Sequence, residues 1–374
     1  MDENEAIQNL ISSPQYEIKQ IEKERILLEI VRIQVKKSIE SNSKIKSMYS
    51  KLGMNVSDIK KLSDLPYIPV QMFKHFNLAI CKKEDIVRIV KSSSTTGQSP
   101  SIIPLDKETS LRQTRALAST LRNFLGTERM PFLVIDSENV NKKSIDLSAR
   151  GAAVRGLSSF AKSITYCLKD TENGMEIDLE KLEEFVKINE GKDVFIFGFT
   201  FIIWINLVQK LKSINKNLDC NFGKATLFHS GGWKKLNDMK VSEDIFSSEV
   251  AEVFNTEKEQ IHNFYGMAEQ TGVIFVDCEM GFKHVPNFAD IIIRDIQTLE
   301  EAKIGNEGLI EVINVLGSSY PSQAILTEDV GNFAGIDDCK CGRRGKYFVF
   351  QKRVEKTELR GCGDIFAKSR ETTL

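Results

Sequence analysis

Small hydroxyl residues and one glycine are concentrated in the stretch SSSTTG, at residues 92–97. Backbone N–H groups and short hydroxyls crowded together in this way can hold phosphate oxygens, although the same residue types also make ordinary turns. The stretch lacks the GK[ST] ending of the Walker loop, which disfavours a P-loop NTPase. The phosphate interpretation therefore depends on support from elsewhere in the chain.

Later stretches supply side chains that suit the rest of a nucleotide. In HNFYGMAEQ, the ring of Tyr265 could stack on a base, and the carboxylate of Glu269 could hold Mg²⁺ against phosphates. Asp329 in LTEDVGNF suits ribose hydroxyls, and Arg353 in FQKRVEK suits phosphate or ribose. Taken singly, these side chains also fit a core ring and surface charges, so the combination carries the prediction.

Cysteine and histidine form a separate set of candidate ligands. Cys278 and His284 lie in CEMGFKH, and Cys339 and Cys341 lie in CKC. Three thiolates and one imidazole can close a structural zinc site, provided that the two turns meet. The alternative is two unrelated turns, since C-x-C is a less usual zinc spacing than C-x₂-C. With seven cysteines and no secretory pattern, metal or thiol chemistry is favoured over a disulfide framework.

The composition excludes several classes of function. The chain has 374 residues with 51 Lys and Arg against 52 Asp and Glu, so no net basic field attracts nucleic acid or an anionic membrane. The most apolar run, residues 194–208, is shorter than the roughly 20 residues that a spanning helix needs. The acidic N-terminus lacks the pattern of a secretory signal. We therefore expect a cytoplasmic protein without a membrane span that binds a small molecule at a local site.

Short β-rich runs alternate with helix-length segments after about residue 85, which predicts an α/β fold with largely parallel strands. These runs are IVRIV, PFLVID, VFIFGF, KATLFHS, GVIFVDC and GLIEVINVL. After about residue 282 short strands and glycine turns predict a small barrel-like or antiparallel layer packed on the α/β part. We expect amphipathic helices packed on the main domain at residues 1–60, the α/β domain with its β layer at 61–350, and a short C-terminal segment at 351–374.

Together and in this order, the stretches resemble the adenylate-forming superfamily. Over residues 10–370 the chain resembles its acyl-protein synthetase family, the fatty-acid-activating component of the fatty acid reductase complex of bacterial bioluminescence. PYIPVQMFKHF, SSSTTG, SGGWKKL and the closing RGCGD carry this likeness. The resemblance implies the large-domain fold of the superfamily, with packed α/β sheets and a C-terminal lid domain that is absent or truncated.

The resemblance also implies roles for the matching positions. The β- and γ-phosphates of ATP would be cradled by Ser93, Ser94, Thr95, Thr96 and Gly97. The adenine and acyl pocket would be lined by Ser230, Gly231, Gly232, Tyr265 and Gly266. Glu269 would bind Mg²⁺, Asp329 the ribose, and Arg353 the ribose or a phosphate. Cys362 would receive the acyl group as a thioester.

Some features leave questions open. Pro100 is followed by Ser101 where the superfamily often has lysine, so no loop lysine would screen the pyrophosphate. The basic residues that could assist adenylation instead are Lys234, Lys352 and Lys356. His229, directly before the Ser-Gly-Gly turn, either lines the acyl pocket or simply ends a strand.

We therefore expect an AMP-forming acid–thiol ligase that uses ATP and Mg²⁺, with a structural Zn²⁺ in addition. It would convert a carboxylic acid, by resemblance a fatty acid, to an acyl-adenylate and then to a thioester on Cys362 for delivery to a partner such as an acyl reductase or transferase. One alternative is an acyl- or aryl-CoA ligase that uses coenzyme A as the acceptor. Another is an inactive nucleotide-binding scaffold subunit, which the missing loop lysine favours.

Overall fold

A computed structural model describes residues 2–92, 100–141, 149–172, 174–233 and 240–354 of the chain. Its α-helices are α1 (Glu3–Ser12), α2 (Gln20–Ser41), α3 (Ser43–Lys51), α4 (Met72–His75), α5 (Lys107–Leu125), α6 (Ala149–Leu157), α7 (Leu179–Ile188), α8 (Thr200–Ile202), α9 (Lys210–Ser213) and α10 (Glu243–Phe254). None of the helices in these ranges is long and apolar enough to cross a bilayer.

The strands before residue 260 are β1 (Ile68–Pro69), β2 (Ile86–Lys91), β3 (Ile102–Asp106), β4 (Met130–Ser137), β5 (Ala161–Thr171), β6 (Gly174–Ile177), β7 (Val194–Phe199) and β8 (Ala225–Ser230). The later strands are β9 (Ile261–Tyr265), β10 (Phe275–Asp277), β11 (Lys283–His284), β12 (Ala289–Arg294), β13 (Glu307–Asn314), β14 (Ile325–Ile336) and β15 (Lys346–Arg353). All six β-rich runs of the sequence lie in or overlap these strands, and the predicted α/β class is confirmed.

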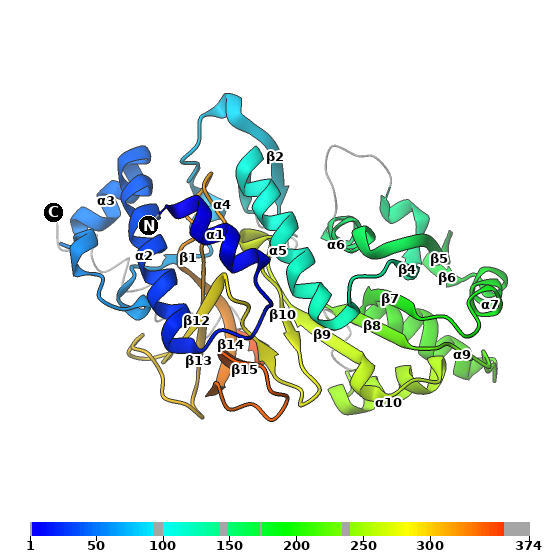
Figure 1. The fold of residues 1–374 in the computed structure, drawn as a ribbon. Helices are drawn as coiled ribbons and strands as arrows, with labels where there is room; N and C mark the ends of the chain where they lie inside the picture. The colour runs from blue at the N-terminus through cyan, green and yellow to red at the C-terminus, as the bar shows by residue number, and fades with distance from the viewer. Residues whose placement is uncertain (1, 93–99, 142–148, 173, 234–239, 355–374) are drawn as a thin grey trace.

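One large sheet of 13 strands organises the molecule, in the order β12-β13-β14-β15-β11-β10-β9-β8-β7-β4-β5-β6, with β1 added to β14. The strands from β9 to β5 pair in parallel. Those from β9 to β12 pair antiparallel. The predicted antiparallel layer is thus hydrogen-bonded to the parallel part through β9 and β10. In Figure 1, α1 to α3 lie beside the antiparallel part, and α6, α7 and α10 surround the parallel part.

The apolar run at residues 194–208 forms strand β7 followed directly by helical turns, as its aromatic and β-branched residues predict. Glycine is needed at position 198, because a Cβ there would lie 2.7 Å from Cγ1 of Ile203 and 3.0 Å from Cβ of Ile135. The helical part includes a π-helix at Ile203–Gln209. The helical turns therefore begin directly at the end of the strand, with Ile203 packed against Gly198.

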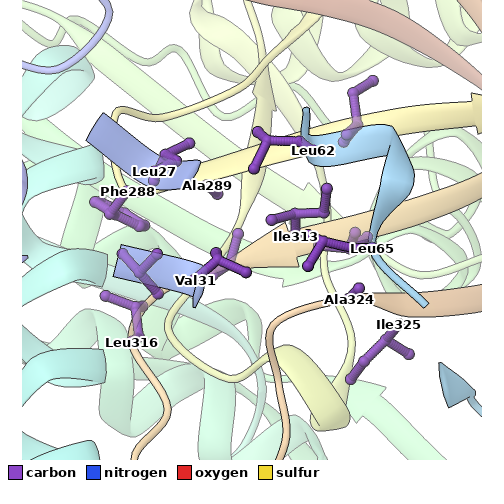
Figure 2. Close-up of a cluster of buried hydrophobic side chains, with 14 of the residues drawn as sticks. Leu27, Val31, Leu62, Leu65, Phe288, Ala289, Ile313, Leu316, Ala324 and Ile325 are labelled. Carbon is purple, nitrogen blue, oxygen red and sulfur yellow. The ribbon is translucent and has the colours of Figure 1, made fainter. Parts of the chain in front are cut away.

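The second helix packs its apolar face on the antiparallel strands. Leu27 and Val31 of α2 are fully buried, and they belong to one hydrophobic cluster with Phe288, Ile313 and Ile325 (Figure 2). Burying such side chains stabilises the fold by about 1.5–3 kcal/mol each. The N-terminal helix α2 is consequently part of the same core as strands β12 to β14.

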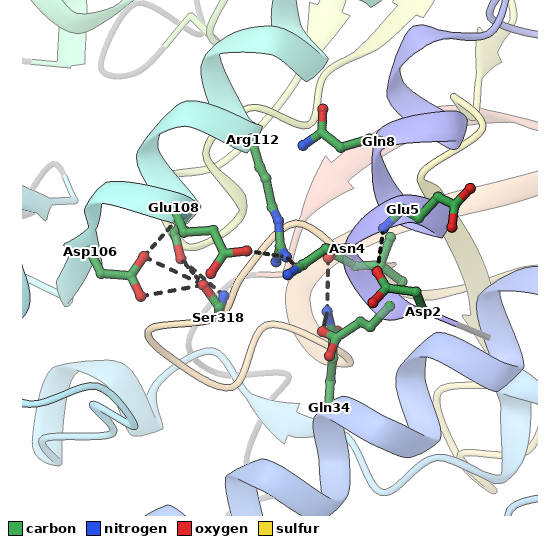
Figure 3. A network of polar contacts seen from close by, with 12 residues as sticks. Asp2, Asn4, Glu5, Gln8, Gln34, Asp106, Glu108, Arg112 and Ser318 are labelled. Atoms are coloured by element: carbon green, nitrogen blue, oxygen red, sulfur yellow. Dashed lines mark hydrogen bonds and ion pairs between the residues drawn. The ribbon is translucent and has the colours of Figure 1, made fainter.

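A buried arginine joins the first helix to α5. Arg112 is 2% exposed, and its guanidinium lies 2.6 Å from the carboxylate of Glu108 and bonds to the side chain of Asn4 (Figure 3). Because Asn4 lies in α1, this contact orients the start of the chain against α5.

Candidate active site

The side chains of Tyr265 and Arg353, which are far apart in the sequence, both contact Asp329. The hydroxyl of Tyr265 donates to Oδ2 of Asp329 at 2.8 Å, and Nε of Arg353 donates to Oδ1 at 2.9 Å. Asp329 is only 3% exposed, whereas the side chain of Arg353 is 68% exposed. The arginine can therefore keep its bond to the aspartate and still present N–H groups to a ligand.

The strand register produces this arrangement. Asp329 in β14 stands opposite Arg353 in the antiparallel neighbour β15, so their side chains share a face of the sheet. Tyr265, the last residue of β9, stacks with Phe350 at a ring-centroid distance of 5.3 Å. Burial, and then the negative charge of Asp329, raise the pKa of Tyr265 well above its usual value, so the phenol stays protonated and donates.

The Ser-Gly-Gly turn follows the neighbouring strand β8. Oγ of Ser230 donates to the carbonyl of Phe264 at 2.8 Å, which ties the turn to β9 one residue before Tyr265. Gly231 has φ of +88°, and a Cβ there would lie 2.9 Å from the ring of Phe199, so glycine is required. A Cβ at Gly232 would meet only open space. The backbone of this turn is therefore open to a ligand next to β9.

Glu269 lies on a short 3₁₀ turn, Ala268–Gln270, four residues after Tyr265. It is 5% exposed, and its backbone carbonyl accepts a hydrogen bond from the hydroxyl of Tyr320 at 2.9 Å. Within the described ranges its carboxylate makes no hydrogen bond or ion pair. A buried carboxylate without a partner among the described residues is suited to a cation.

Several predicted site residues lie outside the described ranges. These are Ser93, Ser94, Thr95, Thr96, Gly97, Cys362, Lys234 and Lys356. Lys352 is described and lies in β15, opposite Val330 of β14.

The structure brings the four Cys and His residues together, at the other end of β14 and β15. One potential ligand atom from each of Cys278, His284, Cys339 and Cys341 lies within 4.8 Å of the other three. The Sγ atoms of Cys278 and Cys339 are 3.9 Å apart, and Sγ of Cys341 lies 3.3 Å from Nε2 of His284. Sulfurs bound to one zinc at about 2.3 Å in a tetrahedron lie about 3.8 Å apart, so the spacing fits.

The electrostatics of this cluster also suit a metal. Burial lowers the pKa of His284 to about 4, so the ring is neutral near pH 7, which is the form that binds metals. Burial raises the pKa of Cys278 to about 12 in the absence of a cation. A bound divalent ion would supply the positive charge that the thiolates need.

The family described as "Acyl-protein synthetase, LuxE" matches residues 3–370. The chain belongs to this acyl-protein synthetase family. It is 22% identical over 329 residues to "Long-chain-fatty-acid--luciferin-component ligase" of Vibrio harveyi, covering 86% of this chain and 82% of the relative. It is 24% identical over 288 residues to the protein of the same name from Aliivibrio fischeri, covering 75% and 72%. The acyl-protein synthetase described here is accordingly a ligase.

The fold of this acyl-protein synthetase is that of adenylate-forming ligases. A crystal structure of 2-hydroxyisobutyryl-CoA ligase, in the postadenylation state in complex with R3-HIB-AMP, superposes with a TM-score of 0.62 at 14% identity. The match covers 90% of this chain and 69% of that structure. This similarity confirms the predicted superfamily fold.

The sequence did not predict two contacts that shape the site of this acyl-protein synthetase. One is the stacking of Phe350 on Tyr265, for which the alternation of side chains along β15 was the available signal. The other is the contact of His229 with Thr200 and Glu243. Thr200 follows β7, His229 lies near the end of β8, and Glu243 begins α10. No spacing in the sequence predicts that these three side chains contact one another.

Proposed function

We propose that this protein activates a fatty acid with Mg-ATP to an acyl-adenylate and then accepts the acyl group on Cys362. Family membership supports acid activation by ATP as the class of reaction. The relatives named as long-chain-fatty-acid ligases support a fatty acid as the substrate. The observation that carries the proposal is the Tyr265–Asp329–Arg353 contact, because it joins an aromatic ring, a buried carboxylate and an exposed guanidinium at one point.

In the first step, a carboxylate oxygen of the acid attacks the α-phosphorus of ATP, and the bond from this phosphorus to pyrophosphate breaks. Asp329 would accept hydrogen bonds from the ribose hydroxyls, and Arg353 would bind ribose or phosphate. Tyr265 and Gly266 would flank the adenine beside the Ser230–Gly232 turn. Mg²⁺ would be bound by Glu269 and would neutralise phosphate charge, while Ser93 to Gly97 would cradle the β- and γ-phosphates.

In the second step, the thiolate of Cys362 attacks the acyl carbonyl carbon, a C–S bond forms, and the C–O bond to AMP breaks. AMP leaves with both electrons of that bond, and the thiol proton passes to solvent or to the released phosphate. The described chain ends at Val354, whose N–H donates to the carbonyl of Glu328 at 2.8 Å, directly beside Asp329. Cys362 follows eight residues later in the sequence. A thioester there would serve delivery to an acyl reductase or transferase.

The test of the activation step is acid-dependent exchange of labelled pyrophosphate into ATP by the full chain, with acids from two to sixteen carbons. We expect exchange that requires Mg²⁺ and is fastest with the longer acids. If no acid supports exchange although ATP binds, the nucleotide-binding scaffold would explain the protein better. If exchange occurs and added coenzyme A becomes acylated in place of the protein, the alternative of an acyl-CoA ligase would explain the protein better.

We further propose that Cys278, His284, Cys339 and Cys341 hold a structural Zn²⁺. The support is the convergence of four suitable ligand atoms, from strand β11 and the turns after β10 and β14, all buried or half-buried. The ion would link the turn after β10 to the turn between β14 and β15. It would act on the stability of the site rather than on the reaction, because a set of four protein ligands leaves no open position for a substrate.

Protein purified without chelator is expected to contain one zinc per chain, measured by mass spectrometry of the metal. Replacing Cys341 with serine removes one ligand, and we expect loss of the zinc and a fall in melting temperature of about 5–10 °C. The matched control is Cys81→Ser, which changes a half-exposed thiol outside the cluster. Equal zinc in wild type and Cys341→Ser, or no zinc in either, would contradict the assignment.

A further inference from the structure

His229 lies at the carboxyl end of β8, directly before the Ser-Gly-Gly turn, and is fully buried. Its Nδ1 lies 2.9 Å from the hydroxyl of Thr200, the first residue of α8. Its Nε2 lies 2.9 Å from Oε1 of Glu243, the first residue of α10. The second contact is within ion-pair distance but does not meet hydrogen-bond geometry.

The hydroxyl of Thr200 connects the ring to the turn, because it also lies 3.2 Å from the carbonyl oxygen of Ser230 and donates to it. A threonine hydroxyl has a single proton. Because that proton goes to the carbonyl of Ser230, the oxygen of Thr200 accepts a hydrogen bond from Nδ1–H of His229. The ring is thereby joined to the backbone of the turn through one side chain.

The carboxylate of Glu243, at the start of α10, also contacts the neighbouring strand β9. Its Oε2 accepts from Nδ2 of Asn263 in β9 at 3.2 Å, so one carboxylate contacts both β8 and β9. Partial burial disfavours the charged form of Glu243, but the contact with His229, together with Lys283 and Asn263, outweighs it and lowers the pKa of this carboxyl to about 2. Thr200 consequently holds Ser230 at the end of β8, and His229 contacts Glu243 at the start of α10.

We propose that His229 is a positioning residue: with Thr200 and Glu243 it holds the end of β8, and so the turn with Gly231 and Gly232, in place against the start of α10. This inference rests on the proposed function, because the glycine turn is where nucleotide and acid would bind. It assigns His229 no contact with substrate. The expected consequence of losing the contact is a displaced turn, and so weaker ATP binding rather than a slower chemical step.

The chain carries its own reporter for this region. It has two tryptophans, and both lie near Phe246 of α10, with ring-centroid distances of 6.1 Å for Trp204 and 6.5 Å for Trp233. Phe246 also packs on the ring of His229 at 4.5 Å. Tryptophan emission therefore reports directly on the packing that the contact supports.

The experiment compares His229→Gln and Glu243→Gln with Asp244→Asn in the full chain. Asp244 is the neighbouring acidic residue in the first turn of α10, but it pairs with Lys258 on the surface, so it is a matched control for helix charge. We expect KM for ATP in the exchange reaction to rise about tenfold in both glutamine variants. We expect kcat to change less than threefold and tryptophan emission to shift to longer wavelength, while Asp244→Asn behaves as wild type.

The half-exposed side chain of Glu243 makes its variant suitable if His229→Gln does not fold. Unchanged KM and emission in Glu243→Gln, or the same rise in KM with Asp244→Asn, would overturn the positioning role. If the wild-type protein shows no exchange with any acid, the proposed function fails. The emission of the variants then still decides whether the contact holds the turn.

Discussion

Replacing Cys362 with serine is expected to abolish formation of the acyl-protein while pyrophosphate exchange stays within about twofold of wild type. The two steps separate because adenylation needs the nucleotide site, whereas thioester formation needs the thiolate. Serine is almost isosteric, but its hydroxyl is hardly ionised near neutral pH and is a much weaker nucleophile. The measurement is intact-protein mass after incubation with Mg-ATP and the best acid.

The identity of the adduct follows from hydroxylamine, which cleaves a thioester under mild conditions. Cys81→Ser, which changes a half-exposed thiol elsewhere in the chain, is expected to keep the full adduct. A hydroxylamine-labile adduct on Cys362→Ser would show that another thiol is the acceptor. Exchange by wild type without any adduct would leave activation in place and exclude Cys362 as an acyl carrier.

Replacing Asp329 with asparagine is expected to lower kcat/KM for ATP by about 100-fold. The buried carboxylate accepts from Tyr265 and Arg353 and, in the proposed complex, from the ribose. Losing hydrogen bonds to a charged group costs about 1.5–3 kcal/mol each. A loss of about 2.7 kcal/mol corresponds to the 100-fold change. Steady-state exchange kinetics with ATP varied at saturating acid measure it.

Glu328→Gln is the matched control, because Glu328 is the adjacent carboxylate of β14 and contacts Gln71 instead. It should leave the kinetics unchanged. Tyr265→Phe removes one donor to Asp329 and is expected to have a smaller effect, about five- to tenfold. If Asp329→Asn binds and turns over ATP like wild type while retaining its melting temperature, Asp329 does not belong to the nucleotide site.

The strands could be predicted because each carries its own signal. The run VFIFGF is aromatic or β-branched at every position except Gly198 and forms β7, which is buried on both faces of the sheet. The order of the strands could not be read in the same way. Strand β11 pairs with its sequence neighbour β10 on one side and with β15 on the other. The pairing of β11 with β15 joins segments more than 60 residues apart, and no local signal in the sequence predicts it.

The candidate site shows the same limit at the level of side chains. Tyr265, Asp329 and Arg353 were suggested by residue type and order, but the hydrogen bonds among them depend on the register of β14 with β15. The contact of His229 with Thr200 and Glu243 was invisible, since sequence gives no distance between the end of one strand and the start of a later helix. The four Cys and His residues were recognisable in two short stretches of sequence because their chemistry is rare and specific.

The position of α2 in the core has a consequence for synthesis on the ribosome. Leu27 and Val31 are buried against Phe288 and strands β12 to β14, which are made about 260 residues later. At a synthesis rate of about 5–20 residues per second, roughly 15–50 s pass before the strands that bury the apolar face of α2 have been made. During this time a nascent chain exposes an amphipathic helix that cannot yet be buried. The first helices to be made are thus among the last to reach their final contacts, and we expect them to be the segment that chaperones shield.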